Sequence, residues 1–434
     1  MNKYKTIIGL EVHIEQNTES KMFCRCSGRY FEKEPNSNTC PVCLGLPGAM
    51  PFANRKAIQN TILFGLSFGC EIAKYSKFDR KHYFYPDLPK SFQISQYDLP
   101  LCGEGVCEFG FGKVRIKRIH QEEDTGKLTH IEEAGAKSSL VDFNRSGVPL
   151  MEMVTEPDFT SADDVVTFLK YVQKVVRYLG ISDADMEKGS MRLEANISLS
   201  PDGSLPDYKV ELKNINSFKF LKGAIEAEVK RQEEALNSGE KLIQETRGYD
   251  QVRKKTVRQR VKETASDYRY FPEPDLLPIV LTDKDIDEVR SRLPELPIAK
   301  QLRFESSFGV SVQYAELLTE DRDKADFFEH LVKETKLDPK KIASELINNK
   351  NYEGVSSVEE FKRIFERENP TLESDIDLIT GIVSKVLEAN QDAVAKYKAG
   401  KLEVIGFLIG QVQRELKGKA DPAETKKILE NLLS

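Results

Sequence analysis

Apolar and polar residues alternate along three segments of the first half of the chain, at residues 8–15, 191–199 and 208–213. Side chains two apart on a strand share a face, so each segment is predicted to form a strand with one apolar and one polar face. The polar positions are Gly9, Glu11, His13 and Glu15 in the first segment, Arg192, Glu194, Asn196 and Ser198 in the second, and Lys209, Glu211 and Lys213 in the third. Each predicted strand therefore presents a carboxylate beside a basic group or a histidine.

Apolar residues at three- and four-residue spacing predict helices over 54–69, 161–180 and 218–239, each ending near a glycine. After residue 295 almost the whole chain has helical period, and the predicted helices are 311–336, 339–349, 358–368, 374–398 and 404–416. Gly418 and Asp421-Pro422 mark the last turn before a short terminal helix. Few strand–helix–strand alternations occur, so we expect an α+β domain on an antiparallel sheet, followed by an all-helical module.

Composition fits a globular protein of more than one domain, with 434 residues, 39% hydrophobic and 31% charged. No apolar run approaches the ~20 residues of a membrane helix, and the N-terminus lacks a signal-peptide pattern, so we expect a cytoplasmic protein that binds no membrane. The formal net charge of −6 argues against a generally basic nucleic-acid binder. It leaves open RNA recognition through shape and local patches.

Four of the seven cysteines form a C-x-C…C-x-x-C pattern, Cys24, Cys26, Cys40 and Cys43. Two close thiolate pairs are what a closed tetrahedral zinc site requires, so a structural zinc knuckle is predicted at 24–43, with a redox pair as the alternative. The other three cysteines, Cys70, Cys102 and Cys107, have no such spacing.

Further acids lie outside the three predicted strands. Glu152 sits in a segment whose two faces are otherwise apolar, so its carboxylate must be paired, bound to metal or neutralised. Glu122, Glu123 and Asp124 are followed closely by Gly126-Lys127, a pattern typical of an exposed charged turn, with a phosphate loop as the alternative because a lysine follows the glycine. No glycine lies five residues before Gly126, so no Walker A loop is present and any nucleotide site must be glycine-poor.

Two of these patterns, the polar strand faces and an aromatic segment, each allow two interpretations. The polar strand faces are either solvated or a site for Mg²⁺ and phosphate, because hard cations prefer oxygen ligands and phosphates prefer guanidinium and ammonium groups. The aromatics of 83–85, which follow the basic segment 77–82, either stack on a nucleotide or on the terminal bases of an RNA, or pack around a proline-rich loop.

Several segments together resemble one family, the B subunits of tRNA-dependent amidotransferases. The segments that carry the resemblance are 8–13, 77–81, 83–89, 93–98, 122–127, 139–145, 194–198, 211–217, 267–275 and 406–411. They follow the family's order over almost the whole chain. The resemblance implies a catalytic cradle on an antiparallel sheet similar to glutamine synthetase at 1–295, a helical domain at 296–400, and tRNA-binding tail helices at 401–434.

The resemblance also implies an activity and its partners. Such a protein uses ATP and Mg²⁺ to phosphorylate the side-chain carboxylate of Glu-tRNA(Gln) or Asp-tRNA(Asn), and ammonia from an amidase subunit then replaces the phosphate. A small third subunit completes the heterotrimer, and no DNA partner is expected. By resemblance, Glu11, His13 and Glu123 hold the metal as catalytic residues, with Glu122 as an alternative ligand and Glu152 as a further catalytic ligand; Arg192, Glu194, Glu211 and Lys213 contact the nucleotide and its metal.

Two departures from the family pattern are expected to matter. Many members lack the four clustered cysteines, which makes zinc the property of a subset, and the region between Phe327 and Leu402 is shorter here. Two other functions remain open from sequence: a stand-alone amide ligase similar to glutamine synthetase, and a non-catalytic zinc-bearing RNA-binding protein. The helical tail counts against the first, and the acidic cluster counts against the second because bare carboxylates repel RNA phosphates.

Overall fold

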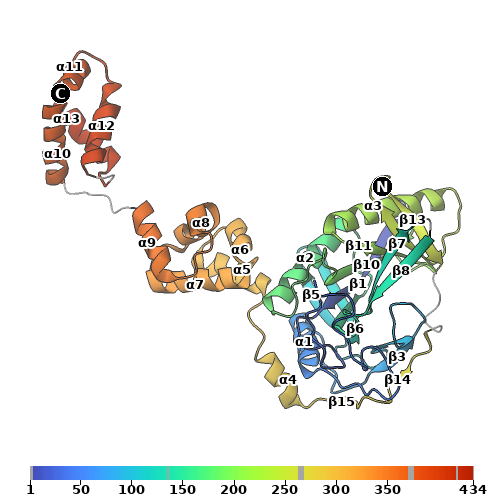
Figure 1. Ribbon diagram of the computed structural model, residues 1–434. Coiled ribbons are helices and arrows are strands. Elements are labelled where there is room, and N and C mark those ends of the chain that lie inside the picture. The colour runs from blue at the N-terminus through green and yellow to red at the C-terminus, as the bar shows by residue number, and fades with distance from the viewer. Residues whose placement is uncertain (1–2, 134–135, 262–267, 370–375, 417–418, 434) are drawn as a thin grey trace. The chain divides into compact units, whose positions relative to one another are not determined.

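The computed structural model describes residues 3–133, 136–261, 268–369, 376–416 and 419–433 (Figure 1). The chain divides into two compact units. The first comprises Met1–Arg303 with Thr319–Arg322, and the second comprises Phe304–Leu318 with Asp323–Ser434.

An eight-stranded sheet organises the first unit, with the order β13-β12-β11-β10-β1-β9-β6-β5. Its strands are β1 (Lys5–Glu15), β5 (Gly105–Phe109), β6 (Gly112–Glu123), β9 (Pro149–Thr155), β10 (Met191–Ser200), β11 (Val210–Ile215), β12 (Glu245–Asp250) and β13 (Lys255–Val261). Only the β11–β12 pair is parallel, and the other neighbours are antiparallel. The predicted α+β fold on an antiparallel sheet is therefore confirmed.

The three alternating segments lie next to one another as β1, β10 and β11. Their apolar side chains form the core with the helices that cover that face, α2 (Ala162–Tyr178) and α3 (Phe218–Asn237) (Figure 1). Ile8, Leu10 and Phe168 are at most 1% exposed. Burying such a side chain stabilises the fold by roughly 1.5–3 kcal/mol, which fixes the register of the sheet, because a one-residue slip would expose the whole apolar row.

The helices of this unit begin where the sequence supplies a cap. The N-caps of α1 (Arg55–Ser67), α2 and α3 are Asn54, Ser161 and Ser217, and each side chain accepts a hydrogen bond from a backbone N–H of the first turn. The three predicted helices are confirmed to within two residues at their ends. A further short helix, α4 (Asp283–Arg290), begins with a capping box between Thr282 and Asp285 that sequence reasoning missed.

Small sheets and a hairpin surround the large sheet. A three-stranded sheet contains β3 (Asp79–His82), β4 (Phe92–Ser95) and β14 (Phe271–Pro272), and a two-stranded one pairs β2 (Tyr75–Ser76) with β15 (Ile279–Val280). The strands β7 (Lys127–Glu133) and β8 (Ala136–Asp142) form a separate hairpin, which Figure 1 shows beside the main sheet.

The second unit is helical. One apolar cluster joins the C-terminal end of α5 (Pro297–Phe308) with α6 (Val312–Leu318), α7 (Arg322–Thr335), α8 (Pro339–Asn348), the 3-10 helix η2 (Lys350–Tyr352) and α9 (Val358–Glu368). Another joins α10 (Ile376–Ala389), α11 (Gln391–Lys398), α12 (Val404–Glu415) and α13 (Pro422–Leu433). The predicted all-helical module is confirmed.

Three details of the helical prediction were wrong. The predicted helix 311–336 is two helices, α6 and α7, and the predicted helix 374–398 is broken at Asn390 into α10 and α11. The helix α5, which begins at Pro297, was missed. Residues Ser374 and Gly418, on which two boundaries were based, lie outside the described residues. None of the helices in the described part of the chain has the length and hydropathy of a membrane-spanning segment.

Candidate functional site

The polar face of the large sheet gathers charged side chains from five strands. Since β11, β10, β1, β9 and β6 are consecutive neighbours, their polar positions form one surface. In the register, Glu11 lies opposite Glu194, and His13 lies between Arg192 on β10 and Glu152 on β9. The face that alternation predicted on three strands therefore continues across two more.

The first cluster on this face surrounds His13. Its Nε2 lies 3.2 Å from Glu152 Oε2 and 3.7 Å from Glu122 Oε1. His120, opposite Glu152 in the β6–β9 register, places its Nε2 3.4 Å from the same Glu152 oxygen. His13, Glu122 and Glu152 offer ligand atoms that all lie within 4.8 Å of one another. Two carboxylates and an imidazole so close together can hold a divalent cation.

Electrostatics in this cluster favour the charged forms. Although burial opposes protonation, the charge of Glu152 and its hydrogen bond, followed by Glu194 and Glu122, raise the pKa of His13 to about 9. Burial likewise opposes ionisation of Glu152, but His120 and His13 lower its pKa well below the usual range. Lys81 of β3 adds another cation: against the effect of burial, Tyr270, Glu122 and Glu152 raise its pKa. The buried carboxylates therefore remain ionised.

The second cluster contains Glu11, Glu194 and Glu211, whose ligand atoms also lie within 4.8 Å of one another. Lys213 Nζ lies 2.7 Å from Glu194 Oε2 and 3.6 Å from Glu211 Oε1. Burial is the largest cause of the raised pKa of Glu194, and the charges of Glu11 and Glu211 add to it. One ammonium facing three carboxylates leaves a negative excess that suits a divalent cation.

Asn196 supplies a further oxygen beside the second cluster. Its Nδ2 donates to Glu11 Oε1 at 2.9 Å, while its Oδ1 is buried with no hydrogen-bond partner among the described residues. A buried carbonyl oxygen without a partner is costly, and a hard cation is one of the groups that would satisfy it. The donor set of this cluster, three carboxylates and an amide oxygen, therefore fits Mg²⁺ in its chemistry.

A third group continues the face at the end of β1. Arg192 Nη2 lies 2.7 Å from Asp124 Oδ2, and Arg145 Nε lies 3.7 Å from the same oxygen. Against burial, these two guanidinium groups lower the pKa of Asp124. Burial and then the charge of Asp124 raise the pKa of Glu15, which accepts a hydrogen bond of 3.0 Å from the Tyr30 hydroxyl. Arg192, which lies opposite His13 in the β1–β10 register, is thus held by Asp124 at this end of the face.

Glu123 does not join the metal clusters. Because side chains alternate along β6, it points to the face opposite Glu122, as does Gln121, which contacts Thr61 of α1. Its carboxylate pairs with Lys90 Nζ and accepts a hydrogen bond of 2.9 Å from the backbone N–H of Ile94. Of the residues expected to hold metal, Glu11 and His13 therefore belong to different clusters, and of the two alternatives Glu122 and Glu123 it is Glu122 that lies beside His13.

The four clustered cysteines converge as their spacing predicted. Their sulfur atoms lie within 4.8 Å of one another, with Cys43 Sγ and Cys40 Sγ 3.8 Å apart. Zinc–thiolate bonds of ~2.3 Å in a tetrahedron place sulfurs about 3.8 Å apart, so the geometry fits zinc. A hydrogen bond from Cys24 is the largest cause of a lowered pKa of Cys43, about 4, and the fully buried Lys21 ammonium, 3.6 Å from its sulfur, adds to it.

Sequence reasoning missed several groups that the structure brings to this face, chiefly His120, Asp124 and Lys81. The signal was present: His120, Glu122 and Asp124 alternate with Gln121 and Glu123 as on a strand. The run of three consecutive acids concealed that period.

The aromatic segment 83–85 has two exposed side chains, Phe84 and Tyr85. In the basic segment before it, the Arg80 guanidinium packs 4.4 Å from the centroid of Phe92.

The fold and this face define an α+β protein with candidate cation sites on the polar face of a mostly antiparallel sheet. Residues 6–287 match the model of the GatB/GatE catalytic domain, and residues 324–433 match that of the GatB domain. The chain is 44% identical over 477 aligned positions to the aspartyl/glutamyl-tRNA(Asn/Gln) amidotransferase B subunit of Thermomicrobium roseum, with 99% of each chain covered. It is similarly 43% identical to the second B subunit of Clostridium acetobutylicum and 42% identical to the B subunit of Thermotoga maritima, again over 99% of each chain.

The chain therefore belongs to the family of aspartyl/glutamyl-tRNA amidotransferase B subunits, as its sequence motifs indicated. These relatives are tRNA-dependent amidotransferase components by name. The alignments run over 477 and 482 positions while this chain has 434 residues, so these relatives contain residues that have no counterpart in this chain.

Proposed function

We propose that this chain uses ATP to phosphorylate the side-chain carboxylate of Glu-tRNA(Gln) or Asp-tRNA(Asn) and then amidates it with ammonia from a glutaminase subunit. The observation that carries the proposal is the pair of acidic clusters on one sheet face. One cluster contains His13 and the other contains Glu11. These two residues are two positions apart on β1, about 7 Å along the strand.

The chemistry requires such a face. A carboxylate is a poor electrophile until a phosphate leaving group is attached to it. Phosphoryl transfer between two anions requires positioned cations to offset their repulsion. Mg²⁺, when bound, would supply that positive charge.

The residues on that face would have two kinds of role, holding cations and binding phosphate. Glu11, Glu194 and Glu211 would hold one cation, and His13, Glu122 and Glu152 another. Arg192, fixed by Asp124, presents a guanidinium group that binds phosphate oxygens with directed hydrogen bonds. Lys213 would neutralise excess carboxylate charge or bind phosphate, depending on the occupancy of the second cluster.

The zinc site would have a structural role. Four thiolates fill a tetrahedral shell and leave no position for a substrate, and the buried Lys21 offsets part of their charge.

The partners proposed for this chain are the amidase subunit, the small third subunit of the heterotrimer and the mischarged tRNA, in the cytoplasm. The C-terminal helices would contact the tRNA.

Amidation of Glu-tRNA(Gln) by the reconstituted complex, with ammonium in place of glutamine, tests the proposal. Wild type should convert the tRNA only when ATP and Mg²⁺ are present. Glu11→Gln and Glu152→Gln should each reduce the rate by about 100-fold or more while the complex stays assembled. Glu108→Gln is the matched control, because this glutamate lies on the edge strand β5 with its side chain 73% exposed.

Two results would contradict the proposal. If wild type is inert with every partner present, this chain does not activate the carboxylate. If both cluster variants keep the activity of Glu108→Gln, activation takes place elsewhere.

A further inference from the structure

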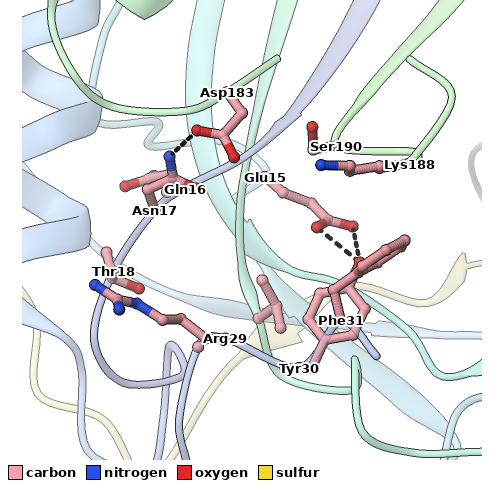
Figure 2. A pocket seen from close by; sticks show the side chains of 12 residues that line it. Glu15, Gln16, Asn17, Thr18, Arg29, Tyr30, Phe31, Asp183, Lys188 and Ser190 are labelled. Atoms are coloured by element: carbon pink, nitrogen blue, oxygen red, sulfur yellow. Dashed lines mark hydrogen bonds between the residues drawn. The ribbon is translucent and has the colours of Figure 1, made fainter. Parts of the chain in front are cut away.

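Neutral hydrogen-bond donors hold several carboxylates of the polar sheet face. At the end of β1, the Tyr30 hydroxyl donates to Glu15 Oε2 at 3.0 Å, as Figure 2 shows. Within the second cluster, Asn196 donates to Glu11 Oε1 at 2.9 Å. A third donor lies on β12, beside Glu211, and belongs to neither acidic cluster.

This donor is Thr246, whose Oγ1 donates to Glu211 Oε2 at 3.0 Å. The two residues lie opposite each other in the parallel β11–β12 pair, and each is 1% exposed. The other oxygen of this carboxylate, Oε1, lies 3.6 Å from Lys213 Nζ, which contacts Glu194 at 2.7 Å. The two oxygens of Glu211 therefore have different neighbours, β12 for Oε2 and the lysine of the cluster for Oε1.

A hydroxyl group is well suited to orient a carboxylate that binds a cation. The last torsion of a glutamate side chain is broad, so the carboxylate plane rotates unless a neighbour holds it. A hydrogen bond to one oxygen restricts that rotation and thereby fixes the direction of the other oxygen. Because the donor is neutral, it orients Glu211 without cancelling the negative charge that attracts a cation.

The strand that carries Thr246 is anchored from its opposite face. Because side chains alternate along β12, Glu245 and Arg247 point away from Glu211 and toward α3. Arg247 Nη1 donates to Glu245 Oε1 at 2.8 Å, and its Nε lies 3.5 Å from Oε2 of Glu228, a fully buried residue of α3. Leaving either charge of a buried ion pair without its partner is costly, so these contacts fix the position of β12. The place of the Thr246 hydroxyl is therefore set by packing outside the site.

We propose that Thr246 is a positioning residue of the second cluster, whose hydroxyl orients the Glu211 carboxylate for a divalent cation held with Glu11 and Glu194. This inference rests on the proposed function, which requires a cation at that cluster. In this role Thr246 does not itself bind the cation or the substrate, and it acts through the carboxylate that it holds.

Mn²⁺ binding to the complete complex tests this role without depending on the reaction. Thr246→Val replaces the hydroxyl with a methyl group of similar size, and it should weaken Mn²⁺ binding by about tenfold, the lower end of the effect expected when the outer hydrogen bond of a metal ligand is lost. Thr246→Ser keeps the hydroxyl and should stay within about threefold of wild type. Thr425→Val is the matched control, because it changes a fully buried threonine of α13 in the other unit.

The same variants in a Glu152→Gln background assign the effect to one cluster. That background removes a carboxylate from the His13 cluster and leaves the second cluster intact. The tenfold effect of Thr246→Val should persist there, since Glu152 belongs to the other cluster.

A second readout separates positioning from a loss of fold. If Thr246 orients a metal ligand, Thr246→Val should raise the Mg²⁺ concentration for half-maximal amidation by about tenfold, and Thr246→Ser should restore it. A purely structural role would instead lower activity by the same fraction at every Mg²⁺ concentration. Thermal unfolding of each complex shows whether the variants remain folded.

Three results would overturn the inference: Mn²⁺ binding in Thr246→Val that matches Thr425→Val, an equal loss in Thr246→Ser and Thr246→Val, or disappearance of the effect in the Glu152→Gln background. Failure of the proposed function is a different result. A wild-type complex that is inert with every partner, but whose Mn²⁺ affinity depends on the Thr246 hydroxyl, would remove the proposed reaction and keep the positioning role. An active complex whose Mn²⁺ affinity does not depend on that hydroxyl would do the reverse.

Discussion

His13 and Glu152 lie directly opposite each other on the neighbouring strands β1 and β9, with Nε2 3.2 Å from Oε2. The pair forms because His13, a polar position of the alternating strand β1, faces Glu152, the single acid of the otherwise apolar strand β9. Its electrostatics lead to the first prediction.

In protein free of divalent metal, the pKa of His13 should be about 9, compared with about 6.5 in the unfolded chain. Because the folded value is the higher one, the stabilisation from the imidazolium is fully present below about pH 6.5 and is lost as pH rises through about 9. Its size is on the order of 3 kcal/mol. Histidine NMR titration and urea unfolding between pH 6 and 10 measure it.

Glu152→Gln should bring the His13 pKa down toward its ordinary value and flatten the pH dependence of unfolding. A cation at this cluster needs the neutral imidazole, so Mn²⁺ affinity should rise with pH over the same range. An unchanged His13 pKa in the variant would show that the Glu152 charge does not control this group.

The zinc knuckle leads to a second prediction. Wild-type protein should contain about one zinc ion per chain, and Cys43→Ser should lose it, because four thiolates are required to close the shell. Cys107→Ser, which changes a cysteine outside the knuckle, is the control and should retain zinc. Elemental analysis and thermal unfolding measure both effects. Full zinc content in Cys43→Ser would exclude the four-cysteine site.

The contact between Lys90 and Glu123 leads to a third prediction. Both side chains are largely buried, so removing one partner leaves an uncompensated charge and should cost about 3–5 kcal/mol. The double variant Lys90→Met/Glu123→Gln should cost less than the sum of the two single changes. Urea unfolding of all four proteins measures the coupling, and additive effects would show that the pair does not interact.

The core that supports the polar face leads to a fourth prediction. Phe168 on α2 is fully buried among Phe68, Phe109 and Phe159, and Phe168→Ala should lower the free energy of unfolding by about 3–5 kcal/mol. Val252→Ala, at a side chain that is 94% exposed, should change it by less than about 0.5 kcal/mol. Equal effects in denaturant titrations would contradict the assigned core.

Much of this protein was determined by its sequence alone. Alternation in 8–15 and 191–199 predicted two strands with one polar face each, since an apolar row must be buried on one side. Helical period ending near a glycine predicted the helices that form as α1, α2 and α3. The spacing of the cysteines predicted their convergence, because two close pairs can surround one ion.

Only the tertiary structure decided which acids meet. Nothing in the sequence distinguishes Glu122 from Glu123 as a ligand. Because side chains alternate along β6, Glu122 lies beside His13, whereas Glu123 pairs with Lys90. Glu11 and His13 were both expected to be metal ligands, with the number of ions left open, and their cross-strand neighbours, Glu194 for Glu11 and Glu152 for His13, divide them between two clusters. Strand order and register are set by packing of the opposite, apolar face, so the contents of the site depend on contacts far apart in the chain.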